Sequence, residues 1–260
     1  MVLLHLVDTF AERPFTGNPA AVCLLDGPKS AEWMQQLAFE LGFAETAYVL
    51  RTEEGLSLRW FTPLIEVSLC GHATMASAHV LWSIGRAHGP INFHTQSGVL
   101  TCERKGRLIY LDLPRIDPVD APPPIGLFAA LGLRPVSVRR ADGDFLLEVQ
   151  DEDIVRRAAP DMRNLTQVNM RGVAITAPSK NPEFDFVSRF FAPQAGINED
   201  PVTGSAHSRL VPYWAKRLGK TVLFARQASA RGGELWCELR GERVTMAGHA
   251  ALYLEGTIEV

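Results

Sequence analysis

The chain has 260 residues, of which 47% are hydrophobic, enough to bury a core in one large domain or two small ones. Its 26 Lys and Arg residues nearly balance its 29 Asp and Glu residues, leaving a formal net charge of -3 and no basic block. This balance argues against nucleic acid as a partner.

The first residues, MVLLHLVDTFAERPF, are apolar only briefly and lack the cationic region and cleavage site of a signal peptide. No run of about 18 apolar residues follows, so the sequence predicts neither export nor membrane spanning. The four cysteines are widely separated and form no C-x-x-C pair, which favours reduced thiols over a disulfide scaffold or a zinc knuckle. We therefore expect a cytoplasmic protein.

Short runs typical of β-strands recur along the whole chain and outnumber the helical segments. The clearest are HLVDTF at 5–10, AAVCLL at 20–25, LSLRWF at 56–61, RLIYLDL at 107–113, GVAITA at 172–177 and VLFARQ at 222–227. Residues 30–42 predict a helix, because apolar residues fall at helical spacing between an N-capping serine and a glycine. These patterns together indicate a mixed α/β (α+β) fold.

Residues 72–84 predict a second helix, whose side chains are small or apolar on every side. A helix of this kind is enclosed by sheet rather than lying on a wet surface, so we expect it to be a central helix. The many prolines between 114 and 135 leave room only for a short helix at 127–131, which makes this stretch the best linker.

An internal repeat supports a division at that linker. The segment FTPLIEVSLCGHATMASAHV at 61–80 resembles FAPQAGINEDPVTGSAHSRLV at 191–211, and Gly71 and Gly204 lie about half a chain length apart. Two pseudo-symmetric halves, 1–115 and 116–260, would explain the repeat, with 250–260 as a candidate strand completing the first half. The active site would then occupy the cleft between the halves. The alternative is a chance match of small-residue loops.

Each repeat enters its helix through a glycine, where backbone N–H groups and the helix dipole favour a carboxylate or phosphate. His72 follows Gly71, and the second loop, Glu199-Asp200-Pro201-Val202-Thr203-Gly204-Ser205, adds two carboxylates and two hydroxyls. Two such helix starts facing one another could hold a small anion between them. Alternatively, each is an ordinary capped helix.

Glu45 is a further candidate for chemistry. On a strand at 43–50 it shares a face with Ala47 and Val49, so its carboxyl group is expected to point inward. Burial would raise its pKa and let it act as both acid and base. The alternative is a solvated carboxylate at a strand end.

Other kinds of site find no support in the sequence. His72 and His79 lie two helical turns apart, too far for paired ligation, and no acidic ligand shares their helix, so we expect no metal. The G-x-S-x-G motif of nucleophilic hydrolases is missing, as are the glycine-rich phosphate loops of nucleotide-binding proteins. Nucleotide cofactors therefore find no support in the sequence.

At these residues the sequence resembles the phenazine-biosynthesis isomerase family, the PhzF-like proteins, whose fold is similar to that of diaminopimelate epimerase. The motifs that carry the resemblance span nearly the whole chain: Phe15-Thr16-Gly17-Asn18-Pro19-Ala20-Ala21-Val22, Ala44-Glu45-Thr46, Phe61-Thr62-Pro63 with Glu66, Cys70-Gly71-His72-Ala73-Thr74 and Glu199-Asp200-Pro201-Val202-Thr203-Gly204-Ser205-Ala206-His207.

The resemblance implies two halves, each a curved, mostly antiparallel sheet around a central helix, and a homodimer without metal or cofactor. It implies a cofactor-independent isomerase that shifts a proton on a small carboxylic-acid substrate. By position, the residues implied in catalysis are Glu45 as general acid/base, assisted by His72, Asp200 and Ser205. Those implied in substrate binding are Gly71, Thr203 and Gly204.

The sequence departs from the related racemases and epimerases, which place two cysteine thiols on opposite faces of the substrate. Cys70 could replace the first thiol, but the second loop offers Asp200 and no cysteine. A racemase or epimerase of a small acid or amino acid is therefore the second hypothesis. A noncatalytic ligand-binding relative is the third.

Overall fold

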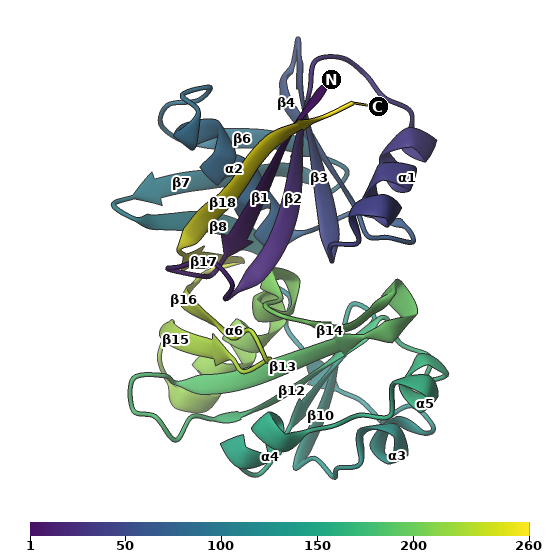
Figure 1. Ribbon diagram of the computed structural model, residues 1–260. Helices are drawn as coiled ribbons and strands as arrows, with labels where there is room; N and C mark the ends of the chain where they lie inside the picture. The colour runs from purple at the N-terminus through teal and green to yellow at the C-terminus, as the bar shows by residue number, and fades with distance from the viewer. Residues whose placement is uncertain (260) are drawn as a thin grey trace. The chain divides into compact units, whose positions relative to one another are not determined.

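The computed structural model describes residues 1–259 and divides the chain into two compact units (Figure 1). The first unit comprises Met1–Leu113 and the C-terminal segment from Met246 onwards, and the second comprises Pro114–Thr245. Val260, the last residue of the predicted strand at 250–260, lies outside the described residues. None of the helices in the described part of the chain is long and apolar enough to cross a membrane.

The first unit is one sheet with a helix on either side. Its strands are β1 (Val2–Thr9), β2 (Asn18–Leu25), β3 (Glu45–Thr52), β4 (Gly55–Phe61), β5 (Glu66–Val67), β6 (Ile91–Thr95), β7 (Gly98–Lys105), β8 (Leu108–Pro114) and β18 (Ala250–Ile258). They pair in the order β18-β1-β2-β3-β4-β6-β7-β8, antiparallel except for β2 with β3 and β4 with β6. The C-terminal strand thus returns to pair with the N-terminal one.

The two helices of this unit cover opposite faces of the sheet. Helix α1 (Ala31–Leu41) begins where the Ser30 side chain accepts a hydrogen bond from the Trp33 N–H and ends at Gly42, as predicted. Tyr48 of β3 faces α1 and donates its hydroxyl to the Met34 carbonyl. Side chains alternate along a strand, so Glu45 and Ala47 point to the other face, toward α2 (Gly71–Ser83).

Helix α2 confirms the predicted central helix. Every residue in it except His79 and Ser83 is buried, and it packs against β1, β2, β3, β7 and β18. Small side chains such as Ala73, Ala76 and Ala78 let the sheet approach the helix closely on several sides. The curved sheet around α2 fixes the helix start beside β2 and β3.

The second unit repeats this topology. Its strands are β9 (Val119–Asp120), β10 (Ser137–Ala141), β11 (Asp144–Glu148), β12 (Gly172–Pro178), β13 (Phe186–Ala192), β14 (Ile197–Asp200), β15 (Val222–Gln227) and β16 (Gly233–Arg240). Strand β17 (Arg243–Gly248) begins in this unit and ends in the first. The pairs β11 with β12 and β13 with β15 are parallel, as are β2 with β3 and β4 with β6 in the first unit. The short strand β14 pairs with β13 as β5 pairs with β4. The shared order confirms the predicted internal repeat.

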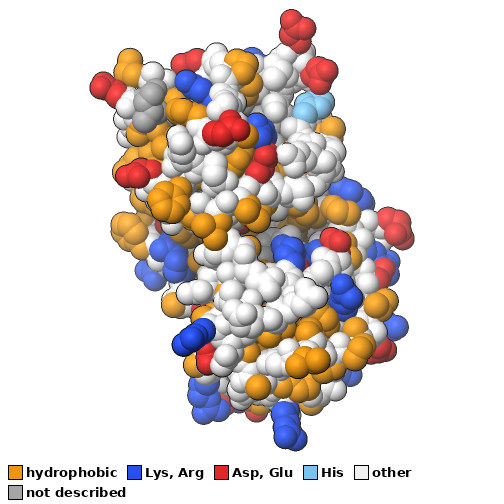
Figure 2. Space-filling model, turned by 90° about the vertical axis from the view of Figure 1, so that its right-hand side faces the viewer, with side chains coloured by type: hydrophobic (Ala, Val, Ile, Leu, Met, Phe, Trp, Pro, Cys, Tyr) orange, Lys and Arg blue, Asp and Glu red, His pale blue; other side chains and the backbone are white. Residues whose placement is uncertain are grey.

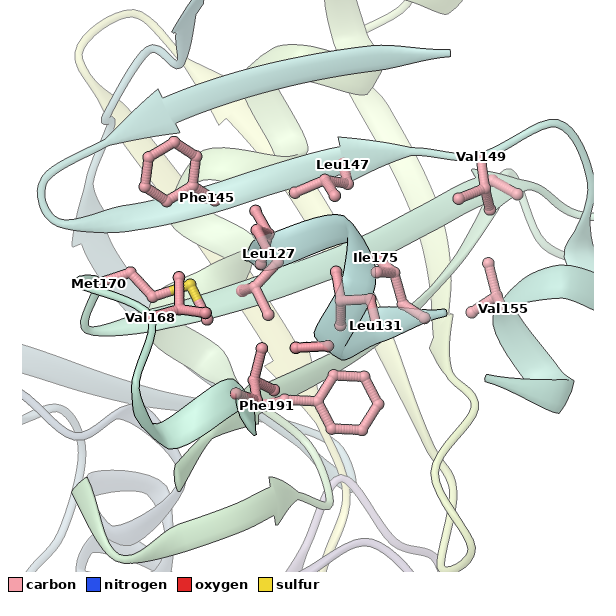
Figure 3. Packing of buried hydrophobic residues seen from close by; sticks show 14 of the residues in the cluster. Leu127, Leu131, Phe145, Leu147, Val149, Val155, Val168, Met170, Ile175 and Phe191 are labelled. Atoms are coloured by element: carbon pink, nitrogen blue, oxygen red, sulfur yellow. The ribbon is translucent and has the colours of Figure 1, made fainter. Parts of the chain in front are cut away.

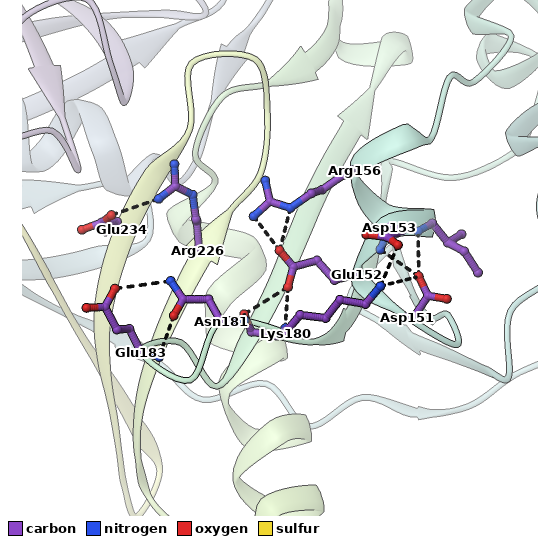
Figure 4. A network of polar contacts seen from close by, with 11 residues as sticks. Asp151, Glu152, Asp153, Arg156, Lys180, Asn181, Glu183, Arg226 and Glu234 are labelled. Carbon is purple, nitrogen blue, oxygen red and sulfur yellow. Dashed lines mark hydrogen bonds and ion pairs between the residues drawn. The ribbon is translucent and has the colours of Figure 1, made fainter.

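One face of the second sheet carries an apolar core beneath three short helices. They are α3 (Leu127–Leu131), at its predicted position, α4 (Glu152–Arg157) and α5 (Met162–Thr166), and the 3-10 turn η1 (Pro193–Ala195) follows β13. Figure 3 shows Leu127 and Leu131 pointing at Phe145, Ile175 and Phe191 from the sheet. A polar network anchors α4, in which Glu152 accepts hydrogen bonds from Arg156 and the Lys180 backbone (Figure 4).

Helix α6 (Gly204–Leu218) lies on the opposite face of this sheet. Trp214 is fully buried and donates its indole N–H to Thr176, the neighbour of Ile175 on β12. Pro212 sits inside the helix and has no N–H to offer the carbonyl of Ser208, four residues earlier. The Ile116 N–H donates to that carbonyl instead, at 3.1 Å. The segment after β8 therefore supplies the donor that Pro212 lacks, and the Ser208 carbonyl keeps a hydrogen bond.

Candidate active site

The first unit brings three reactive side chains together at the start of α2. Glu45 at the beginning of β3 is 9% exposed, Cys70 is 4% exposed and His72 is 2% exposed. The Nε2 atom of His72 lies 3.5 Å from Oε2 of Glu45, and its Nδ1 lies 3.5 Å from Sγ of Cys70. Two of the catalytic residues implied by the resemblance, Glu45 and His72, are therefore neighbours.

A tight turn between β1 and β2 positions the imidazole. Gly17 has a φ of +66°, and a Cβ there would lie 2.1 Å from the Thr9 carbonyl oxygen, so only glycine fits. The turn places the buried Asn18 against α2, where its Nδ2 donates to Nδ1 of His72 at 3.2 Å. The other ring nitrogen, Nε2, faces Glu45. The glycine-asparagine motif thus orients His72.

Burial determines the charge of His72. Desolvation lowers its pKa from the ordinary 6.5 to about 3, outweighing a backbone hydrogen bond to Pro19 that raises the pKa. The imidazole is therefore neutral at neutral pH, able to donate one hydrogen bond and accept another. Beside a neutral histidine, the carboxyl group of Glu45 is the group better suited to exchange a proton.

Helix α2 begins without a side-chain cap. Cys70 occupies the N-cap position in an extended conformation, and no side chain hydrogen-bonds to the first turn from there. Thr74 instead donates to the Cys70 carbonyl one turn along the helix. The glycine at the first helical position keeps the approach to the backbone N–H groups open, which suits an anionic group of a substrate.

The second unit assembles the corresponding loop at the start of α6. Asp200 is buried at the end of β14, and Thr203 occupies the N-cap position without capping the helix through its side chain. Gly204 and Ser205 form the first turn, and Ser205 is half-buried. The four residues implied by the resemblance in this half therefore lie on one continuous loop and helix start.

Gln227 holds this loop in place and was not predicted. It is fully buried at the end of β15, where its Nε2 donates to the Asp200 carbonyl at 2.7 Å and to the Thr203 hydroxyl at 3.1 Å. Its Oε1 accepts from the Thr203 N–H at 2.8 Å. A glutamine at the end of the strand VLFARQ is the only sequence signal for this role.

A buried ion pair supports the same helix start from behind. Arg209 is 5% exposed, and its Nη1 donates to the Ser205 carbonyl and lies 3.6 Å from Oδ2 of the 3%-exposed Asp144. Its Nε donates to the Ala141 carbonyl at 3.1 Å. Desolvation raises the pKa of Asp144 although Arg171 and Arg209 oppose it. The guanidinium thus ties the first turn of α6 to the sheet.

His207 gives the second unit a pH-dependent stability. It is fully buried on α6, with Nδ1 2.8 Å from the Thr203 carbonyl oxygen, and burial lowers its pKa from 6.5 to about 4. Between pH 6.5 and pH 4, His207 is protonated in the unfolded chain but not in the folded chain. The free energy of unfolding therefore falls as the pH drops toward 4. The expected loss is about 1.4 kcal/mol per pH unit from this group.

Urea unfolding of the wild type and of His207→Gln between pH 7 and pH 5 measures this contribution. We expect a shallower fall in the free energy of unfolding for the variant, because its amide takes up no proton. The remaining fall includes the contribution of His72, whose pKa is lowered in the same direction. Identical slopes for the two proteins would contradict the assigned role of His207.

Comparisons with known proteins agree with this architecture. The family model for phenazine biosynthesis-like protein matches residues 7–256. An uncharacterized isomerase from Pseudomonas aeruginosa is 48% identical over 257 residues, 98% of each chain. The crystal structure of a PhzF-family phenazine biosynthesis protein from Enterococcus faecalis has a TM-score of 0.93 and 41% identity, covering 100% of this chain and 99% of its own.

The fold extends to a more distant group. A predicted epimerase from Pseudomonas aeruginosa has a TM-score of 0.79 at 20% identity, with complete coverage of both chains. The expected epimerase-like fold is therefore confirmed. On the match over nearly its full length, the chain belongs to the phenazine biosynthesis-like family, the PhzF-like proteins.

Proposed function

We propose that the protein is a cofactor-independent isomerase that shifts a proton on a small carboxylic acid. The observation that carries the proposal is the buried carboxyl group of Glu45, 3.5 Å from the neutral imidazole of His72 at the start of α2. A carboxylate of this kind can remove a proton from carbon and return one as the carboxylic acid.

The proposed reaction proceeds through a carbanion. The Glu45 carboxylate takes a proton from a carbon whose negative charge can spread into a conjugated carboxylate, so the C–H bond breaks and its electron pair moves into that system. The protonated Glu45 then delivers a proton to another carbon, and the double bond shifts. His72 lies beside the Glu45 carboxyl group, with its Nε2 3.5 Å from Oε2.

Binding of an anionic group is assigned to the start of α2, where backbone N–H groups at Gly71 would donate to the substrate carboxylate and the helix dipole would stabilise the developing negative charge. By the resemblance, Gly204 is assigned the same kind of contact at the start of α6 in the second unit. Asp200 and Ser205 would assist, the hydroxyl as a donor and the aspartate as a second proton-exchanging group. Thr203 would contact the substrate from the loop before α6, whose position Gln227 fixes by hydrogen bonds to the Thr203 N–H and hydroxyl.

Racemisation or epimerisation by two thiols is the second candidate, because Cys70 lies 3.5 Å from Nδ1 of His72. Such a reaction needs a partner thiol, and Cys237 is the one cysteine after residue 113. Cys237 is buried on β16, where desolvation raises its pKa far above the neutral range. A single carboxylate base therefore fits the residues better than a thiol pair.

Hydrogen exchange with solvent tests the proposal. Small carboxylic and amino acids are first screened for thermal stabilisation, and each ligand is then incubated with the protein in deuterated water. We expect deuterium to enter a carbon next to, or conjugated with, the carboxylate of at least one ligand. Ligands that stabilise the protein but never incorporate deuterium would instead indicate a noncatalytic binding protein.

The Cys70→Ser variant separates the two candidate reactions. If Glu45 is the base, a serine at position 70 should leave deuterium incorporation within about tenfold of the wild type, because it removes no proton-transferring group. If Cys70 is the base, incorporation should fall by about 100-fold or more, since serine is far less acidic than cysteine. Proton NMR of the ligand measures both rates.

A further inference from the structure

Three side chains that meet beside the start of α2 are of types that can hold a metal ion. Glu45, Cys70 and His72 each offer a ligand atom, and these atoms all lie within 4.8 Å of one another. Among the described residues 1–259, no other group of three such side chains meets this distance. Spacing along the sequence pointed away from a metal because it considered only ligands on the helix of His72 and His79, whereas Glu45 lies on β3.

We infer that Glu45, Cys70 and His72 bind a zinc ion, and that the ion inhibits the enzyme by occupying its base. One sulfur, one nitrogen and one oxygen ligand are the types that zinc takes in tetrahedral sites. The charges of a thiolate and a carboxylate together neutralise the ion. A fourth coordination position remains for water or for the carboxylate of a substrate.

The distances suit this assignment. Zinc bonds of about 2.0 Å in tetrahedral geometry place a nitrogen and an oxygen ligand about 3.3 Å apart. Nε2 of His72 and Oε2 of Glu45 are 3.5 Å apart, so both can reach one ion with little movement. Cys70 Sγ lies 3.5 Å from Nδ1 of His72, and the three ligand atoms, one from each residue, all lie within 4.8 Å of one another. Rotation about the single side-chain torsion of Cys70 can bring Sγ closer to the ion.

The surroundings also fit a bound metal. Asn18 contacts Nδ1 of His72 at 3.2 Å, and its amide can present either nitrogen or oxygen to that atom. When Nε2 binds the ion, Nδ1 carries the hydrogen and the Asn18 oxygen can accept it, as outer partners of ligating histidines usually do. The burial of all three ligands limits competition from water.

Inhibition follows from the chemistry and rests on the proposed role of Glu45. A carboxylate bound to zinc no longer has the lone pair that removes a proton from carbon. The site would take zinc in preference to magnesium, since magnesium favours an octahedral set of oxygen ligands and binds thiolates poorly. Zinc would therefore act as a reversible inhibitor, and magnesium would not.

Cobalt substitution tests the metal site independently of any activity. Co²⁺ is added to the reduced protein without oxygen, and the absorption spectrum is recorded. We expect a thiolate-to-cobalt charge-transfer band, tetrahedral cobalt bands in the visible, and displacement of both by Zn²⁺ but not by Mg²⁺. Cys70→Ser should abolish the charge-transfer band, whereas Cys237→Ala, a buried cysteine in the other unit, should retain it.

A wild-type spectrum without the charge-transfer band, or a band that persists in Cys70→Ser, would overturn the metal site. Inhibition is tested separately, by measuring deuterium incorporation with Zn²⁺ and with Mg²⁺. We expect saturating zinc to lower the rate at least tenfold. Undiminished exchange in protein whose spectrum shows a full site would overturn the inhibitory role. If no ligand exchanges hydrogen at all, the spectra still decide whether the metal binds.

Discussion

Replacing Arg209 by methionine is expected to lower the free energy of unfolding by about 3 kcal/mol, because it leaves the buried carboxyl of Asp144 without its buried cation. The guanidinium also donates to the carbonyls of Ala141 and Ser205, which lose these partners in the variant. Arg171 remains bonded to Asp144, but its side chain is 45% exposed, so solvent weakens its compensation.

Urea denaturation measures this loss, and two further variants show its origin. Arg157→Met removes a cation whose side chain is 79% exposed, and we expect a change below about 0.5 kcal/mol. Asp144→Leu combined with Arg209→Met should recover part of the lost stability, since it removes the uncompensated carboxyl as well. If Arg209→Met is no less stable than Arg157→Met, the buried ion pair does not support the second helix start.

The sequence predicted elements whose signals are local. The serine and glycine that bound α1 and the apolar composition of α2 both lie within a few residues of the structure they determine. The repeated loops around Gly71 and Gly204 predicted the duplication because both copies keep the same glycine-initiated helix. To predict the short strands, it was enough to find alternation or an apolar run in the sequence. All six runs named in the sequence analysis fall on strands.

The contacts that support the candidate site could not be predicted in this way. Gln227 meets Thr203 across 24 residues of chain, and Arg209 meets Ala141 across 68. A buried arginine on an amphipathic helix looks like a solvated one until the sheet that covers it is known. The hydrogen-bond partners of buried polar side chains cannot be read from the sequence, because the partners are brought together only by the fold.

Glu45 illustrates both the success and the limit of sequence reasoning. Its alternation with Ala47 and Val49 predicted an inward-pointing carboxyl, and the side chain is buried. Its neighbour His72 lies on α2, and the turn at Gly17 places Asn18 against that histidine. No local pattern in the sequence indicates either contact. Strand alternation identifies the face of a side chain, whereas tertiary packing identifies its neighbours.

The measurement that tests the account most directly is deuterium incorporation by Glu45→Gln, with the ligand that the wild type labels. Glutamine keeps the size and hydrogen-bonding capacity of the side chain but exchanges no proton with carbon. We predict that the rate falls about 1,000-fold, in the range of general acid–base catalysis, while the ligand still raises the melting temperature. Glu40→Gln, an exposed carboxylate on α1, should keep the wild-type rate. Incorporation at the wild-type rate by Glu45→Gln would contradict the assignment of Glu45 as the base.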